Sequence, residues 1–187
     1  MSDYSVAVRE PVNITYRGYT LRSCPAPSSG ILAINDILIS GTIALSALNI
    51  LEGYDMSNIT NLNVSTHRLV EAIKFAYGQR GKLADPQYIH NVTELEGLFL
   101  KKNTGRVIRN LIRDNSTYQP QEYDPSTYLS ILDDNSIPVE DSGTSHMVTA
   151  DEDGLVVSLT TTVNLFWGAR IMVPETGSRS PLNYVDK

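Results

Sequence analysis

The sequence predicts a fold of the α+β class, with short antiparallel strands near both ends of the chain and helices between them. Three observations favour this class. Apolar and polar residues alternate from Val6 to Leu21, amphipathic stretches follow in the middle, and a second alternating run surrounds Asp151–Gly154. A period of two is typical of strands and a period near 3.6 is typical of helices. With 187 residues, 41% of them hydrophobic, the chain can form one core or part of a larger one.

The first alternating stretch is expected to form a hairpin that turns at Arg17-Gly18. The next residues, "SCPAPSSG", contain two prolines and a Ser-Ser-Gly, which favour a loop. From Ile31 to Leu51 the chain is apolar almost throughout, but Asp36 interrupts this run. The remainder, Ile37 to Leu51, is shorter than the ~20 residues that cross a bilayer, so we expect a buried helix.

Two further helices are expected. The first begins at Ser65 or Thr66 as N-cap and ends between Gly78 and Pro86. The second covers Val92 to Ile112, with a break at Asn103 to Gly105, and its basic clusters are interpreted as solvated faces. Residues 114–143 lack periodicity and are expected to form a long loop. After them, Asp153-Gly154 between two alternating runs predicts a hairpin.

Composition excludes several classes of function. A net charge of -6 and a pI near 5.0 argue against nucleic acid as a partner. Cys24 is the single cysteine, so no disulfide forms within the chain, and we expect it to be a small buried residue. The histidines His67, His90 and His146 share no metal-ligand spacing, so neither a metal nor another cofactor is expected.

Two observations bear on cellular location. The amino terminus has no basic region followed by an apolar one, so we expect neither a signal peptide nor a transmembrane anchor in this chain. Five Asn-x-Ser/Thr acceptors nevertheless suit a secreted protein. They begin at Asn13, Asn58, Asn63, Asn91 and Asn115.

Thr144 stands in a Gly-Thr-Ser-His sequence at the expected start of a strand. A threonine becomes a nucleophile when a base takes its proton, and its own α-amino group can serve once the residue is a chain terminus. Attack of Thr144 on the carbonyl of Gly143 would create that terminus. A Gly-Thr before a strand is ordinarily only a turn, and spacing alone leaves both interpretations open.

The stretch "SGTSHMVTADEDGLVVSLTTTVNLFWGARIMVPETG" resembles the start of the small subunit of the γ-glutamyltranspeptidase family, in particular its fungal members. Upstream, "YRGYTLRSCPAPSSG", "ALNILEGYD" and "HRLVEAIKFAYGQRGKLADP" are similar to the carboxy-terminal half of the large subunit, in the family's order. The resemblance implies a partial αββα fold of the Ntn-hydrolase type. Residues 1–143 would end the large subunit, and residues 144–187 would begin the small, catalytic one.

The resemblance also implies the activity and its residues. Gly143 and Thr144 match the self-processing bond, and Thr144 matches the nucleophile that attacks the γ-glutamyl amide of glutathione. Water or an amino-acid or peptide acceptor then takes the γ-glutamyl group. Thr162 matches the residue that orients the nucleophile, and Asn164 matches a residue that binds the substrate's α-amino group; His146 and Ser145 are interpreted as framework. The implied partner is the complementary subunit of a processed heterodimer. The implied location is the secretory pathway, with the protein extracellular, vacuolar or anchored to a membrane.

The chain departs from the family in three places. It has no match to the family's substrate-binding arginine or to the segments that follow Gly177 and build the oxyanion hole. We therefore expect little self-cleavage, since oxyanion donors are often the largest catalytic contribution. Ile31 to Ser40 is interpreted as an insertion, and both it and the last ten residues fit translated non-coding sequence. The alternatives are an inactive relative that binds or modulates a complete one, and an α+β binding module.

Overall fold

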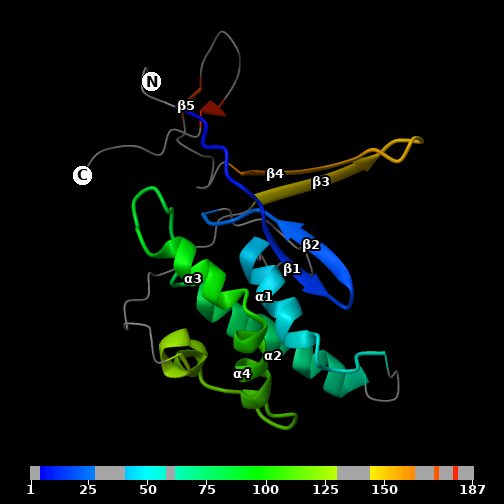
Figure 1. The fold of residues 1–187 in the computed structure, drawn as a ribbon, viewed down its shortest axis with the longest axis vertical. Coiled ribbons are helices and arrows are strands. Elements are labelled where there is room, and N and C mark those ends of the chain that lie inside the picture. The colour runs from blue at the N-terminus through cyan, green and yellow to red at the C-terminus, as the bar shows by residue number, and fades with distance from the viewer. Residues whose placement is uncertain are drawn as a thin grey trace. The chain divides into compact units, whose positions relative to one another are not determined.

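The computed structural model describes residues 5–27, 41–57, 62–129, 144–162, 171–172 and 179–180. The chain divides into two compact units, the first including the described residues up to 129 and the second those from 144 onward. Both helices and strands are present, as the sequence predicts. The helices are α1 (Gly41–Leu51), α2 (Leu62–Arg80), α3 (Val92–Phe99), α4 (Lys102–Leu111) and the 3-10 turns η2 (Pro120–Tyr123) and η3 (Pro125–Thr127) (Figure 1). The strands are β1 (Val12–Tyr16), β2 (Tyr19–Ser23), β3 (Thr144–Ala150), β4 (Val156–Thr162), β5 (Ile171–Met172) and β6 (Arg179–Ser180).

The predicted first hairpin is confirmed, although its strands are shorter than the alternating stretch. β1 and β2 pair in antiparallel fashion from Val12–Ser23 to Tyr16–Tyr19. The turn between them has positive φ at Arg17 (51°) and Gly18 (88°), the backbone of a type I′ turn, which matches the twist of the strands.

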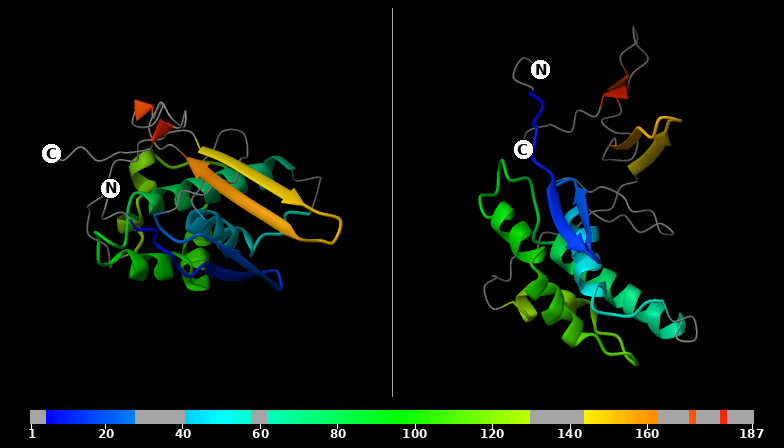
Figure 2. Two further views of the ribbon diagram at one scale, coloured as in Figure 1. Left: turned by 90° about the horizontal axis from the view of Figure 1, so that it is seen from above. Right: turned by 45° about the vertical axis from the view of Figure 1, so that its right-hand side comes forward.

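Helix α1 is the centre of the first unit. It contacts α2, α4 and the β1–β2 hairpin, and it lies beside that hairpin in both views of Figure 2. Ile43 and Ile50 are fully buried, so the predicted buried helix is confirmed from Gly41 onward. The expected insertion, residues 31–40 with Asp36, lies outside the described residues. None of the helices within the described residues has both the length and the apolar character needed to span a bilayer.

Helix α2 begins before its predicted N-cap and ends within the predicted range. It begins at Leu62, so the predicted start at Ser65 or Thr66 is wrong, and it runs through Gly78 to end at Arg80, between Gly78 and Pro86. A side chain at Gly78 would overlap the backbone of Tyr123. Glycine is therefore present here to allow close packing against η2, a requirement that outweighs its low helix propensity.

The expected helix over Val92 to Ile112 is two helices, α3 and α4. The chain breaks at Leu100–Lys101, where the amide of Leu100 bonds to the carbonyl of Glu96, and the predicted break at Asn103 to Gly105 is wrong. Gly105 lies inside α4 and is buried where that helix crosses α1, because a side chain there would overlap the backbone of Asn49.

The prediction of a long loop is correct for residues 114–119 and wrong for residues 120–127. Here η2 and η3 pack against α2, and three tyrosines take part. The rings of Tyr118, Tyr123 and Tyr128 meet Phe75 edge to face at centroid distances of 5.7, 4.9 and 5.6 Å. Residues 117–128 are called the tyrosine segment below. It escaped prediction because 3-10 turns carry no helical or strand period. Residues 130–143 lie outside the described residues.

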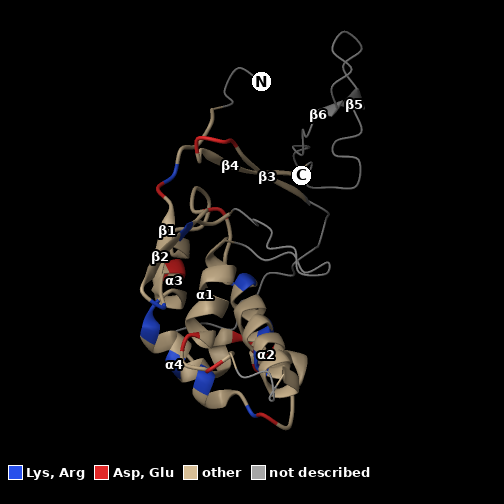
Figure 3. Ribbon diagram, turned by 90° about the vertical axis from the view of Figure 1, so that its right-hand side faces the viewer, with Lys and Arg blue, Asp and Glu red and all other residues tan. Residues whose placement is uncertain are grey.

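Two smaller expectations are also corrected. Cys24 is exposed rather than buried, whereas Ala26, two residues later, is buried. Figure 3 shows the positions of the basic residues along α4, of which Lys102 and Arg106 are exposed and Arg109 is not. The half-buried Arg109 turns inward and donates to the carbonyls of Ile50 (2.7 Å) and Asn49 (2.9 Å) at the end of α1.

Candidate functional site

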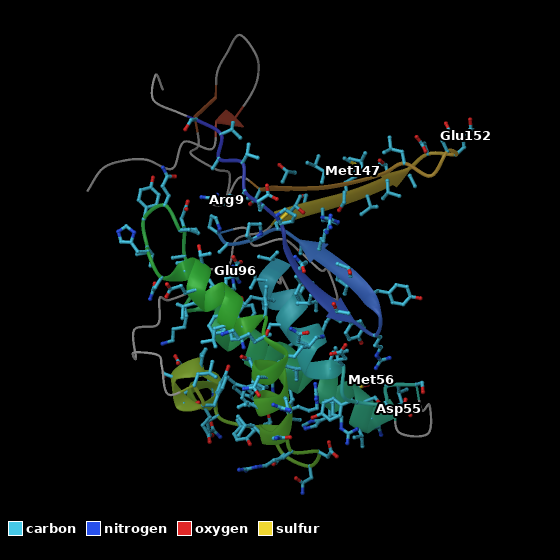
Figure 4. The ribbon with its side chains drawn as sticks, in the orientation of Figure 1. Arg9, Asp55, Met56, Glu96, Met147 and Glu152 are labelled. Carbon is cyan, nitrogen blue, oxygen red and sulfur yellow. The ribbon has the colours of Figure 1, made fainter. Side chains whose placement is uncertain are left out.

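The second unit contains the β3–β4 ribbon, which carries the predicted nucleophile. The strands pair in antiparallel register from Thr144–Thr162 to Ala150–Val156, which confirms the hairpin predicted at Asp153-Gly154. In the turn, the carboxylate of Asp151 accepts the amides of Asp153 (3.1 Å) and Leu155 (2.8 Å), and Gly154 has a positive φ of 87°. Glu152 lies at the tip of this turn, at the opposite end of the ribbon from Thr144 (Figure 4).

Thr144 and Thr162 occupy one directly opposed pair of positions. Thr144 is the first residue of β3 and Thr162 is the last residue of β4, so this pair closes the end of the ribbon. Directly opposed residues of an antiparallel pair share a face, with Cβ atoms about 5 Å apart. The register thus brings together two of the residues predicted from the sequence. Gly143 and Asn164, the other two, lie outside the described residues.

His146 makes contacts that the sequence-based interpretation as framework did not specify. Its Nδ1 lies 2.8 Å from Oγ1 of Thr160, and its Nε2 lies 3.3 Å from Oγ of Ser158. Because alternate residues share a face, all three belong to the face of the Thr144–Thr162 pair. Counting in steps of two from Thr144 and Thr162 would have identified this polar row.

Apolar residues also occur on both faces of the ribbon, among the polar ones. Met147, Val157 and Leu159 belong to one face and Val148 and Val156 to the other. All five are exposed by half or more in the structure, and Figure 4 labels Met147 on β3. Among residues 144–162 the ionisable side chains are those of His146 and the acidic turn.

The first unit also contains buried polar groups, some of which bond to one another. Glu96 accepts the amide of Ala26 (2.8 Å) and the hydroxyl of Thr42, which ties the loop after β2 to α1 and α3. Within the described ranges, no three His, Cys, Asp or Glu side chains are grouped so that they could hold a metal ion.

Comparison with known proteins places these features in a family. The sequence profile described as Gamma-glutamyltranspeptidase matches residues 1–178. The chain belongs to the γ-glutamyltranspeptidase family. It is 38% identical over 180 residues to a glutathione hydrolase proenzyme of Arthroderma benhamiae and 36% identical over 178 residues to a glutathione hydrolase of Aspergillus flavus. Each alignment covers 95% of this chain, which spans about a quarter (27%) of either relative.

A solved structure agrees with the family. The γ-glutamyltranspeptidase of Helicobacter pylori superposes with a TM-score of 0.58 at 25% sequence identity, over 72% of this chain and 35% of that one. The mixed arrangement of helices and strands described above is therefore shared with a member of the family.

Proposed function

We propose that this chain is part of a γ-glutamyltransferase and glutathione hydrolase whose nucleophile is Thr144. The observation that carries the proposal is the opposition of Thr144 and Thr162 at the end of the β3–β4 ribbon, in a chain of this family. The relatives from Arthroderma benhamiae and Aspergillus flavus are named glutathione hydrolases, which supports γ-glutamyl amides as substrates.

The first step is self-cleavage between Gly143 and Thr144. The hydroxyl oxygen of Thr144 attacks the carbonyl carbon of Gly143, and the C–N bond breaks as the nitrogen takes the proton. The resulting ester is hydrolysed by water, which leaves a carboxylate on Gly143 and a free α-amine on Thr144. That amine has a reference pKa of about 8, so part of it is unprotonated near neutral pH and can act as a base.

In turnover, the amine of Thr144 takes the hydroxyl proton as the oxygen attacks the γ-glutamyl carbonyl. The C–N bond of the substrate breaks, the amine product leaves with that proton, and a γ-glutamyl ester remains on Thr144. Water then releases glutamate, or the amine of an amino acid or peptide accepts the γ-glutamyl group. In this scheme the hydroxyl of Thr162 bonds to that of Thr144 and orients it, and Asn164 binds the α-amino group of the substrate.

The same proposal covers architecture and location. Residues 1–143 end a large subunit and residues 144–187 begin a small subunit of a processed heterodimer, within an αββα fold of the Ntn-hydrolase type. The family match across residues 1–178 supports this division. The family resemblance and the Asn-x-Ser/Thr acceptors support a location in the secretory pathway.

The experiment compares three variants by intact mass and by release of product from a γ-glutamyl chromogenic amide. Each is made in this chain and in a hybrid where residues 6–177 replace the matching region of the Arthroderma benhamiae relative. In the hybrid, Thr144→Ala abolishes both cleavage and product release, Thr144→Ser retains part of each, and the control Thr149→Ala changes neither; little cleavage is expected in this chain by itself. A folded hybrid that remains uncut and inactive with Thr144 intact contradicts the proposal.

A further inference from the structure

We infer that His146 is a positioning residue, which ties β3 to β4 beside Thr144 and Thr162 and holds that terminal pair in register. The relevance to catalysis rests on the proposed function, whereas the tie itself is a property of the ribbon. The inference starts from the imidazole of His146, both of whose nitrogens lie within bonding distance of a hydroxyl on the opposite strand.

The two contacts span successive positions on one face of β4. Thr160 is directly opposite His146, and Ser158 is its diagonal neighbour. A hydroxyl both donates and accepts, so the neutral ring can satisfy both nitrogens in either tautomer, and the protonated ring can donate to both. The ring therefore joins the strands in every protonation state.

These contacts argue against the simpler idea that His146 removes a proton from Thr144. A base needs a nitrogen directed at the group that it deprotonates. Here Nδ1 meets Thr160, and Nε2 meets Ser158, which is opposite Val148 and therefore farther along the ribbon from Thr144. The geometry assigns the ring a mechanical role.

The terminal pair depends on such a tie for a physical reason. The last pair of a ribbon opens more readily than the interior pairs. A slip of one residue in register would turn Thr162 to the other face and separate His146 from both of its hydroxyls. The His146 contacts thus favour the one register in which Thr144 and Thr162 are opposed.

The test measures amide hydrogen exchange along β3 and β4 in the uncut Thr144→Ala background, so that cleavage plays no part. In His146→Leu, the backbone amides of residues 145 and 161, the pair next to Thr144–Thr162, are expected to exchange about fivefold faster. This is the effect of losing one net hydrogen bond. His146→Gln, which keeps a donor and an acceptor, restores much of the protection. Thr149→Leu places the same leucine on the other face and leaves exchange unchanged. Equal exchange in the parent and His146→Leu, or equal acceleration in Thr149→Leu, overturns the inference.

A second variant keeps the test decisive if His146→Leu unfolds the ribbon. Thr160→Val with Ser158→Ala removes the partners and keeps the ring. It is expected to accelerate exchange to the same extent as His146→Ala, which removes the ring, and combining the two changes should produce no further acceleration, because interacting residues are not additive. Full additivity contradicts the tie.

Kinetics in the hybrid separate positioning from proton transfer. His146→Leu lowers kcat more than it raises KM, His146→Gln recovers most of kcat, and the pH dependence keeps its shape. A glutamine variant as inactive as leucine, with one limb of the pH profile lost, identifies a base and overturns the inference. A parent hybrid that neither cleaves nor turns over refutes the proposed function, and the exchange data still decide on the tie.

Discussion

Glu71 illustrates how one residue can decide the packing of a segment distant in sequence. Its carboxylate is buried in α2 and accepts hydrogen bonds from Thr117 (2.7 Å), Tyr123 (2.8 Å) and Lys74 (3.0 Å). Burial raises the pKa of Glu71, but these hydrogen bonds and the charge of Lys74 outweigh it, and the net pKa lies below the ordinary value of 4.5. Glu71 therefore anchors the tyrosine segment to α2 as a carboxylate.

The lowered pKa predicts how stability depends on pH. A carboxyl group whose pKa is lower in the folded state stabilises it above the unfolded-state pKa, and this contribution is lost as pH falls through the folded-state value. For Glu71 this stabilising contribution is lost as the pH falls below 4.5. Glu71→Gln should lower the free energy of unfolding by about 1–3 kcal/mol at pH 7 and reduce its dependence on pH in the acidic range. Denaturant titrations at several pH values measure both, and an unchanged pH dependence contradicts the role of Glu71.

Two helical glycines offer a matched comparison. In an open helical position, Gly→Ala stabilises by about 0.5–1 kcal/mol. A methyl group added at Gly97 in α3 would meet open space, whereas one added at Gly78 would overlap the backbone of Tyr123. Gly97→Ala should raise Tm and Gly78→Ala should lower it. Calorimetry of both variants provides the check, and stabilisation by both would show that the tyrosine segment does not press on α2 in solution.

At the scale of elements, the carboxyl end of α1 is capped by hydrogen bonds from a side chain of another helix. The last carbonyls of a helix have no partner within it. Arg109 of α4 bonds to those of Asn49 and Ile50, and Gly53 leaves room for the guanidinium group, because a side chain there would overlap it. A basic residue at this position also interacts favourably with the helix dipole.

This arrangement predicts unequal effects within the basic residues of α4. Arg109→Leu should destabilise the first unit by about 1–3 kcal/mol, because two carbonyls lose a charged donor. Arg106→Leu is the control, since Arg106 is exposed and bonds within its own helix to Asn103. Thermal unfolding of the two variants followed by circular dichroism should show a clear difference. Similar Tm values would mean that water replaces Arg109 at no cost.

The elements that could be predicted from the sequence are those with a regular period. Both hairpins and the central helices follow from alternation or helical spacing together with Arg17-Gly18 and Asp153-Gly154. The misses arise from tertiary contacts, which no local pattern encodes. Gly105 lies inside α4 because that helix crosses α1 closely there, and Arg109 faces inward because α1 ends nearby.

At the scale of the whole molecule, the sequence alone predicts which chemistry to look for but not how its residues are arranged. Thr144 and Thr162 are predicted from family resemblance, and the register of the ribbon brings them into opposition. The contacts of His146 could not be predicted, because a histidine on an exposed strand has many partners within reach. Gly143 and Asn164 remain predictions.

The exposed apolar residues of the β3–β4 ribbon predict that the chain associates in solution. Large exposed apolar surface and open strand edges favour association. Met147, Val157 and Leu159 form one such face of β3–β4, so the chain expressed alone should self-associate in a concentration-dependent manner. Val157→Thr with Leu159→Thr keeps β-propensity and should shift the chain toward monomer. Val6→Thr with Val8→Thr is the control, because those valines are at least as exposed but lie outside any strand, and it should leave association unchanged. Light scattering across a concentration series measures the mass, and a monomer at every concentration for the unaltered chain refutes the prediction.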